Sequence, residues 1–145
     1  MHRSILIYDE DCGFCRWSAD RIRAWDRRGV LRFEPVQSAW AARLLRAVPL
    51  ERRAASWHLV EPDGRVWSGG AAVPRLMRTL PAGAPIAMLA EMAPGATDRI
   101  YAAVARRRAV LGRLLGQRAC SVDPSGAARS DHSGAAGSGS SSRTR

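Results

Sequence analysis

Hydrophobic and polar positions along the chain first divide it into short strand-like runs and helix-like segments. Residues 4–8 form an apolar run rich in Ile and Leu and bounded by acids, which predicts a short buried strand. Apolar residues at helical spacing follow over residues 17–27, and Gly29 is expected to stop this helix. Alternation over residues 30–36 then predicts a second strand, which ends near Pro35.

The middle of the chain predicts one helix and a β-hairpin. Ser38 is expected to cap a helix over residues 38–47. Residues 56–60 and 65–68 are rich in strand-forming side chains, and Pro62-Asp63-Gly64 between them supplies the residue types of a tight turn. We therefore expect two adjacent antiparallel strands here.

Three further helices are predicted in the last part of the ordered chain. The first covers residues 71–79 and has Pro74 in its first turn, where the missing N–H costs little. The second covers residues 84–92. The third begins at a cap formed by Thr97-Asp98 and stops at Gly116. The apolar stripe expected to face the core on this last helix consists of Ile100, Val104, Leu111 and Leu115.

This order of elements predicts an α/β fold: a mixed four-stranded sheet flanked by helices on both faces, with an additional C-terminal helical segment. The strand–helix–strand start implies a parallel crossover, and the hairpin adds an antiparallel pair. It matches the order of a thioredoxin-like domain. We expect this domain over residues 1–120 and a disordered tail, rich in Ser, Gly and Ala, over residues 121–145.

Charge and cysteine usage narrow the functional classes. The net charge is +10 and all 23 basic residues are arginine, but they are spread through the helices, and the run Arg106-Arg107-Arg108 is expected to be a solvated helix face. No nucleic-acid partner is therefore expected. The stretch 82–96 contains Glu91 and helix breakers, so no transmembrane segment is expected either. An odd count of three cysteines and the lack of a signal-peptide pattern predict a cytoplasmic protein.

Candidate chemistry lies directly after the first strand, in the segment Asp9-Glu10-Asp11-Cys12-Gly13-Phe14-Cys15. Cysteines at positions i and i+3 at a strand-to-helix junction place Cys12 at or next to the first helical turn, where backbone N–H groups and the helix dipole favour a thiolate. The two sulfurs can also close a small ring, as thiol–disulfide exchange requires. Our hypothesis is that Cys12 attacks a disulfide and Cys15 resolves the mixed disulfide.

The neighbouring acids allow two roles. A carboxylate close to Cys12 opposes ionisation of the thiol, but it can shuttle the proton of Cys15. Asp11 can instead cap the helix, which we favour slightly for this residue. Asp9 is the better candidate for a functional carboxylate.

The same residues resemble the signature of the DCC family of thiol–disulfide oxidoreductases. The Asp and the two Cys of the family motif fall on Asp9, Cys12 and Cys15, and the likeness extends over about residues 4–120. It implies a thioredoxin-like fold and a redox role with a disulfide-containing protein or a small thiol as partner, together with an electron donor. Thioredoxins carry a cis-proline just before the third strand, whereas Ala55-Ser56 stands here.

Two alternatives remain open beside the enzyme. A closed metal site needs four ligands, and beyond the cysteine pair the chain offers only Cys120, His2, His58 and His132 without ligand-like spacing, so we expect neither a metal nor another cofactor. His58 is expected to be a sheet residue with its hydrogen bonds satisfied. The second alternative is a non-catalytic redox-sensing or interaction module whose cysteine pair switches a partner surface.

Overall fold

The computed structural model describes residues 3–116, so Cys120, His132 and the tail predicted over residues 121–145 lie outside the described residues. The strands are β1 (Ser4–Tyr8), β2 (Leu31–Pro35), β3 (His58–Val60) and β4 (Val66–Ser68). The helices are α1 (Gly13–Trp25), α2 (Ala39–Leu44), α3 (Leu50–Arg53), η1 (Gly69–Ala71, a 3-10 turn), α4 (Ala72–Thr79), α5 (Ala84–Met92) and α6 (Pro94–Leu114).

The four strands form one mixed sheet in the order β2-β1-β3-β4. Strands β1 and β2 run parallel, with Leu6 opposite Phe33, whereas β3 is antiparallel to both β1 and β4. This confirms the predicted α/β architecture, which is compatible with a thioredoxin-like fold. The first strand is central, so the segment that follows it leaves from the middle of the sheet.

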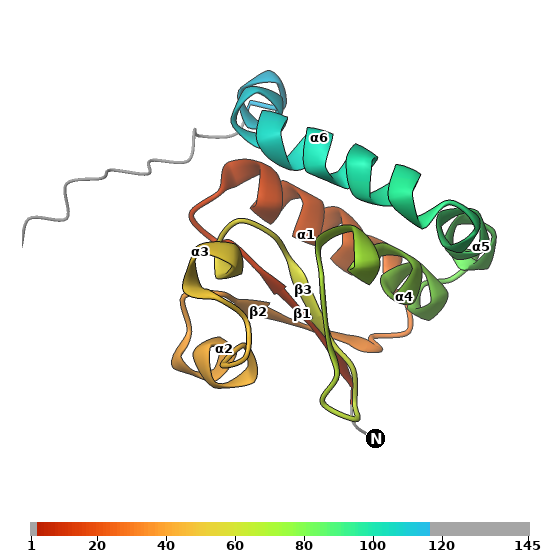
Figure 1. Ribbon diagram of the computed structural model, residues 1–145, viewed down its shortest axis with the longest axis horizontal. Helices are drawn as coiled ribbons and strands as arrows, with labels where there is room; N and C mark the ends of the chain where they lie inside the picture. The colour runs from red at the N-terminus through yellow and green to blue at the C-terminus, as the bar shows by residue number, and fades with distance from the viewer. Residues whose placement is uncertain (1–2, 117–145) are drawn as a thin grey trace, which may run out of the picture.

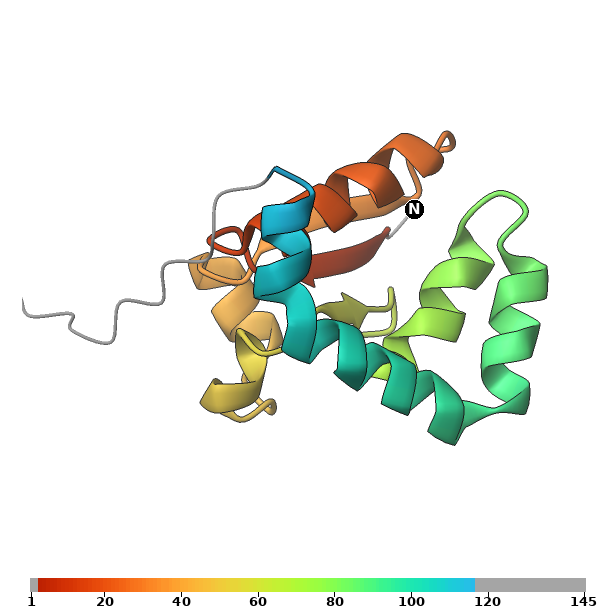
Figure 2. The same cartoon turned by 90° about the horizontal axis from the view of Figure 1, so that it is seen from above.

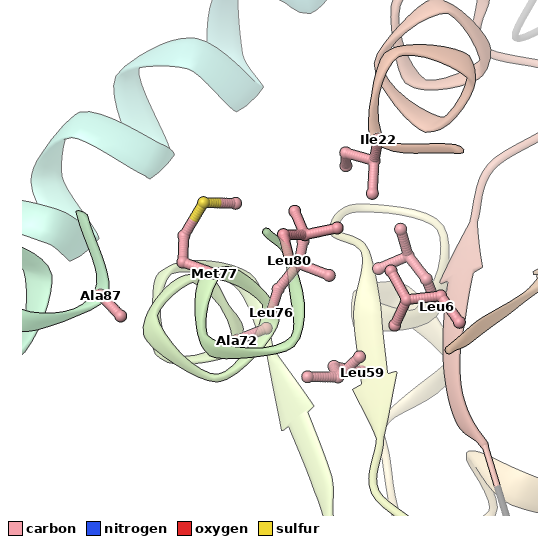
Figure 3. Packing of buried hydrophobic residues seen from close by; sticks show 9 residues of the cluster. Leu6, Ile22, Leu59, Ala72, Leu76, Met77, Leu80 and Ala87 are labelled. Carbon is pink, nitrogen blue, oxygen red and sulfur yellow. The ribbon is translucent and has the colours of Figure 1, made fainter. Parts of the chain in front are cut away.

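Neighbouring residues of β1 point to opposite faces of the sheet, and each face has its own core. Leu6 belongs to a cluster with side chains of α1 and α4, among them Ile22 and Leu76, shown in Figure 3. Ile7 belongs to a smaller cluster on the other face, with Ala41 of α2 and Leu45 just after it. The prediction of helices on both faces is therefore confirmed.

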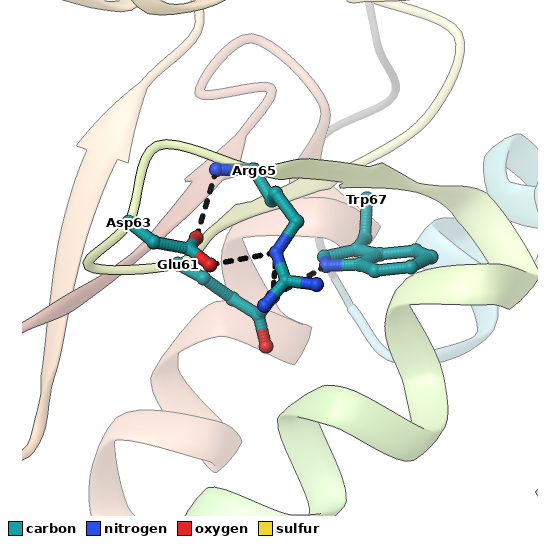
Figure 4. A network of polar contacts seen from close by, with 4 residues as sticks. All are labelled: Glu61, Asp63, Arg65 and Trp67. Carbon is teal, nitrogen blue, oxygen red and sulfur yellow. Dashed lines mark hydrogen bonds and ion pairs between the residues drawn. The ribbon is translucent and has the colours of Figure 1, made fainter.

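Polar contacts fix the hairpin between β3 and β4 (Figure 4). The backbone N–H of Arg65 donates to Asp63 Oδ1 at 3.0 Å, and the Arg65 Nε donates to Asp63 Oδ2 at 2.6 Å. Across the hairpin, Nε1 of Trp67 in β4 donates to Oε2 of Glu61, the residue after β3, at 2.8 Å. Gly64 supplies the positive φ of 87° that the turn needs. The Pro-Asp-Gly turn predicted from the sequence is thus the observed one.

The long helix α6 lies across α1 and beside α5 on the same side of the sheet, as Figures 1 and 2 show. It is seated at two glycine contacts. A Cβ at Gly70 of η1 would lie 2.2 Å from Asp98 Oδ1, and a Cβ at Gly112 would lie 3.4 Å from the backbone nitrogen of Phe14. One contact joins the first half of α6 to η1, and the other joins its end to the start of α1.

Several element bounds differ from the sequence-based prediction. The helix expected over residues 38–47 ends at Leu44, and the short α3 follows it. The last helix begins at Pro94 with Ala93 as its N-cap, while Thr97 lies inside it and donates to the backbone oxygens of Ala90 and Ala93. Capping by Thr97-Asp98 was therefore wrong, because Pro94, at the first position of α6, already starts the helix earlier.

The apolar stripe predicted for this helix is not buried. Ile100 is 66% exposed and Val104 is 38% exposed, whereas Gly112 of the same helix is buried and Tyr101 is half-buried. Within the part of the chain described, no peptide bond is cis, and no helix has both the length and the apolar character needed to cross a membrane.

Candidate functional site

Cys12 is the N-cap residue of α1. Its extended backbone (φ −88°, ψ 109°) ends the loop after β1, and its Sγ accepts a hydrogen bond of 3.4 Å from the backbone N–H of Cys15. The predicted place of Cys12 at the first turn of the helix is confirmed. Capping of this helix by Asp11 is not, because the sulfur of Cys12 occupies the capping position. An N-terminal helix end favours negative charge on such a group.

Cys15 lies one turn further along α1 and differs from Cys12 in accessibility. Cys12 is fully buried, whereas Cys15 is half-buried. The pKa of the Cys15 thiol is raised, first by its side-chain hydrogen bond with Cys12 and then by burial, while Arg108 acts in the opposite direction. A raised pKa means that Cys15 keeps its proton more readily than an ordinary thiol does.

The two candidate carboxylates are held together by Gln37, two residues after β2. Its Nε2 donates to Asp9 Oδ1 at 2.7 Å and to Asp11 Oδ2 at 3.0 Å, and the backbone N–H of Asp11 also donates to Asp9 Oδ1. Asp9 contributes to the raised pKa of Cys15, the effect expected of a negative charge nearby. The acids and the cysteine pair therefore form one local cluster at the end of β1.

A cavity of about 520 Å³ opens beside Cys15. Its walls come from the end of β1, the start of α1, the segment before β3, and the helices α4, α5 and α6. The side chains that enclose most of it are apolar, among them Phe14, Trp57, Val73, Ile86, Leu89, Ile100 and Val104. Cys15 belongs to this wall, as do Asp9 and Arg108. Phe14, which lies between the two cysteines in the sequence, belongs to the same wall.

The position of α6 above this cavity explains why its apolar stripe is exposed. Ile100 and Val104 face an open space and not a filled core. Tyr101, one residue from Ile100, supports the helix instead: its hydroxyl accepts a hydrogen bond of 3.1 Å from the backbone N–H of Trp57, and its ring stacks on the indole of Trp57. Burial raises the pKa of the Tyr101 hydroxyl to about 12.

Arg108 is the functional candidate that sequence analysis missed. The run of three arginines was assigned to a solvated face, which holds for the exposed Arg106 and Arg107. Arg108 is half-buried, lines the cavity, and donates from Nη1 to the backbone oxygen of Ala54 at 3.0 Å. One feature of the sequence could have identified Arg108: it lies seven residues after Tyr101, which places both residues on the same face of α6, two helical turns apart.

His58 has the structural role expected of it. Nε2 lies 3.0 Å from the backbone oxygen of Arg53, which can only accept, so this nitrogen carries the hydrogen and Nδ1 accepts from Ser68 Oγ at 2.7 Å. Burial lowers the pKa of His58. Over residues 3–116, no group of three or more His, Cys, Asp or Glu side chains is arranged to hold a metal ion.

The comparisons with known proteins agree with this geometry at the level of the family. The family model described as DCC1-like thiol-disulfide oxidoreductase matches residues 6–114, a range that includes both cysteines, the hairpin and all of α6. No curated protein and no solved structure matches the chain.

Proposed function

Since this chain belongs to the DCC1-like thiol-disulfide oxidoreductase family, we propose that it exchanges disulfides through Cys12 and Cys15. The partner is a disulfide-containing protein or a small thiol. One observation carries the proposal: the two sulfurs are hydrogen-bonded at the N-terminus of α1, beside a cavity that Cys15 lines. Such a pair holds one thiolate and one thiol, the two forms that consecutive exchange steps need.

Within the pair, we propose that Cys12 is the attacking thiolate and Cys15 the resolving thiol. The helix N-terminus and the N–H of Cys15 stabilise negative charge on Cys12, and the raised pKa of Cys15 keeps its proton in place until resolution. Cys12 is fully buried, so its attack requires the first turn of α1 to open far enough to expose the sulfur. The trapping experiment below measures whether it does.

Reduction of insulin and of a small disulfide tests the exchange. We expect activity in the wild-type protein and in Cys120→Ser, a cysteine control outside the motif, and loss of activity in Cys12→Ser and Cys15→Ser. Wild-type activity in Cys12→Ser would refute the proposed nucleophile. Inactivity of the wild-type protein on both substrates would instead favour a redox-sensing module.

Trapping separates the roles of the two cysteines. A Cys15→Ser variant should accumulate a mixed disulfide at Cys12, since the resolving thiol is missing. Peptide mapping of the trapped adduct identifies the bonded cysteine. Rapid trapping at Cys15 in Cys12→Ser, with none at Cys12 in the reciprocal variant, would transfer the attacking role to the more accessible cysteine.

For the acids, we propose that Asp9 assists proton transfer at Cys15. Support comes from its place in the cavity wall and from its effect on the pKa of Cys15. Asp11 shares Gln37 with Asp9 and helps to orient it. Asp9→Asn should slow turnover and change its pH profile, whereas Glu10→Gln, which removes the neighbouring exposed carboxylate, should not. Full activity with an unchanged pH profile in Asp9→Asn would exclude this role.

The compartment that we propose is the cytoplasm, where thiols are kept reduced and a Cys-x-x-Cys pair is more often catalytic than structural. Fractionation of cells that carry the tagged full chain, combined with alkylation of the pair in the intact cell, tests this. A pair found fully oxidised in an extracytoplasmic fraction would contradict it.

A further inference from the structure

The cavity beside Cys15 has a strongly uneven distribution of charge. The charged side chains in its wall are Asp9 and Arg108. Asp9 directly follows β1, and Arg108 lies one helical turn before Gly112, which packs against Phe14, so both lie near the cysteine pair. Most of the remaining wall is formed by apolar side chains, with Leu89 of α5 and Ile100 and Val104 of α6 among them. The cavity therefore has a polar end with a thiol and an apolar body.

Its size limits what can enter. About 520 Å³ lies within the roughly 300–1,000 Å³ typical of small-molecule sites, and it is too small for a folded protein. The helix above it is held at separate points, by Gly70 against Asp98 and by Gly112 against Phe14, and the stretch between them spans the space. Ile100 and Val104 lie on that stretch and remain exposed to solvent. An apolar ligand would cover them.

We propose that this cavity binds a small disulfide carried on a hydrocarbon chain, with the sulfurs at Cys15 and the chain against α5 and α6. The disulfide of such a molecule fits the polar part of the cavity, and its hydrocarbon chain fits the apolar part. A hydrophilic disulfide would leave the apolar wall exposed to water, which is unfavourable. The proposal rests on the proposed exchange chemistry for the role of the sulfurs, but binding can be measured without that chemistry.

The electron balance follows from ordinary exchange. A thiolate of the pair attacks one substrate sulfur, which forms a mixed disulfide and breaks the substrate S–S bond, and the released sulfur takes up a proton. The second cysteine loses its proton and attacks the bonded cysteine, releasing the other substrate sulfur as a thiol. The substrate gains two electrons and two protons, and Cys12 and Cys15 become a disulfide.

Binding is tested in a full-length Cys12→Ser/Cys15→Ser protein, which cannot exchange disulfides at this site. Lipoamide serves as the probe, a neutral cyclic disulfide on an aliphatic chain, and hydroxyethyl disulfide serves as the neutral hydrophilic comparison. We expect saturable lipoamide binding by titration calorimetry, with NMR shifts at the methyl groups of Ile100 and Val104. Equal binding of the two probes, or lipoamide shifts away from these methyl groups, would overturn the proposal.

Matched variants on α6 locate the site. Val104→Trp places an indole in the cavity, while Val110→Trp makes the same change at an exposed valine of α6 that is not part of the wall. Lipoamide binding should weaken roughly tenfold or more in the first and stay unchanged in the second. Should Val104→Trp fail to fold, Leu89→Trp against Met88→Trp repeats the comparison on α5. Equal binding within the folded pair would overturn the proposal.

The two proposals can fail separately. Insulin reduction by the wild-type protein without lipoamide binding by the Cys12→Ser/Cys15→Ser protein would leave the exchange function standing and remove the cavity ligand. Lipoamide binding that responds to Val104→Trp, in a protein without any reductase activity, would support the site and remove the exchange function.

Discussion

The backbone N–H of Cys15 donates to the sulfur of Cys12 at 3.4 Å, and a second hydrogen bond joins the two side chains. The helix thus caps itself with one cysteine of the pair, and that cysteine also raises the pKa of the other. This arrangement ties the ionisation of each cysteine to the presence of the other.

Removal of Cys12 should make Cys15 more acidic. The hydrogen bond with Cys12 is the largest cause of the raised pKa of Cys15, and the charge on Cys12 adds to it. In Cys12→Ala, we therefore expect alkylation of Cys15 to begin at a lower pH than in the wild-type protein. Mass spectrometry of the Cys15 peptide across a pH series measures this. An unchanged alkylation profile would show that the two cysteines do not share a proton.

Arg108→Gln should slow resolution of a mixed disulfide. Arg108 lowers the pKa of Cys15, so its loss leaves less Cys15 thiolate at a given pH. A partly exposed charge interaction is worth roughly 0.2–1 kcal/mol, which corresponds to a decrease in rate of up to about fivefold. Stopped-flow kinetics of the resolving step measure it. Arg107→Gln, an exposed neighbour, is the control, and equal effects of both changes would contradict a local role.

Gly70→Ala should destabilise the packing of α6. The added Cβ would lie 2.2 Å from Asp98 Oδ1 and 2.9 Å from the Asp98 Cα, and the backbone contact cannot be relieved by a rotamer change. We expect the free energy of unfolding to fall by about 1–3 kcal/mol in urea titrations. Gly95→Ala is the control, because a Cβ there meets nothing within 4 Å, and it should be neutral or stabilising by up to about 1 kcal/mol.

His58 should make stability depend on pH. Burial of the imidazole lowers its pKa below the ordinary 6.5, so the unfolded chain takes up this proton first. The contribution of neutral His58 to the free energy of unfolding is fully present above pH 6.5. It is lost as the pH falls from 6.5 toward the folded pKa, by about 1.4 kcal/mol for each pH unit. Urea unfolding between about pH 7.5 and 5.5 measures the slope. His58→Gln should flatten it, and an equal slope in this variant would assign the effect to other groups.

Local patterns predicted most elements because short-range interactions decide them. The apolar run of β1 and the turn at Pro62-Asp63-Gly64 each depend on residues within a few positions. The helix stop expected at Gly29 was wrong: α1 ends at Trp25 with Asp26 as its C-cap, and Gly29, with its positive φ of 59°, lies in the turn that follows. The bounds of the elements were predicted less accurately than their existence. The last helix was expected to begin at Thr97-Asp98 but begins at Pro94, since several nearby residues can begin a helix.

The sequence by itself determined the order of the elements, the mixed sheet and the place of Cys12 and Cys15 at the start of α1, because spacing along the chain is enough to set them. Only the tertiary structure decided that Cys12 is buried, that Cys15 lines a cavity, and that Arg108 joins it from a helix far along the chain. The apolar stripe of α6 did not reveal that Ile100 and Val104 face a cavity and stay partly exposed. That depends on long-range packing at glycine contacts, which spacing along the chain does not encode.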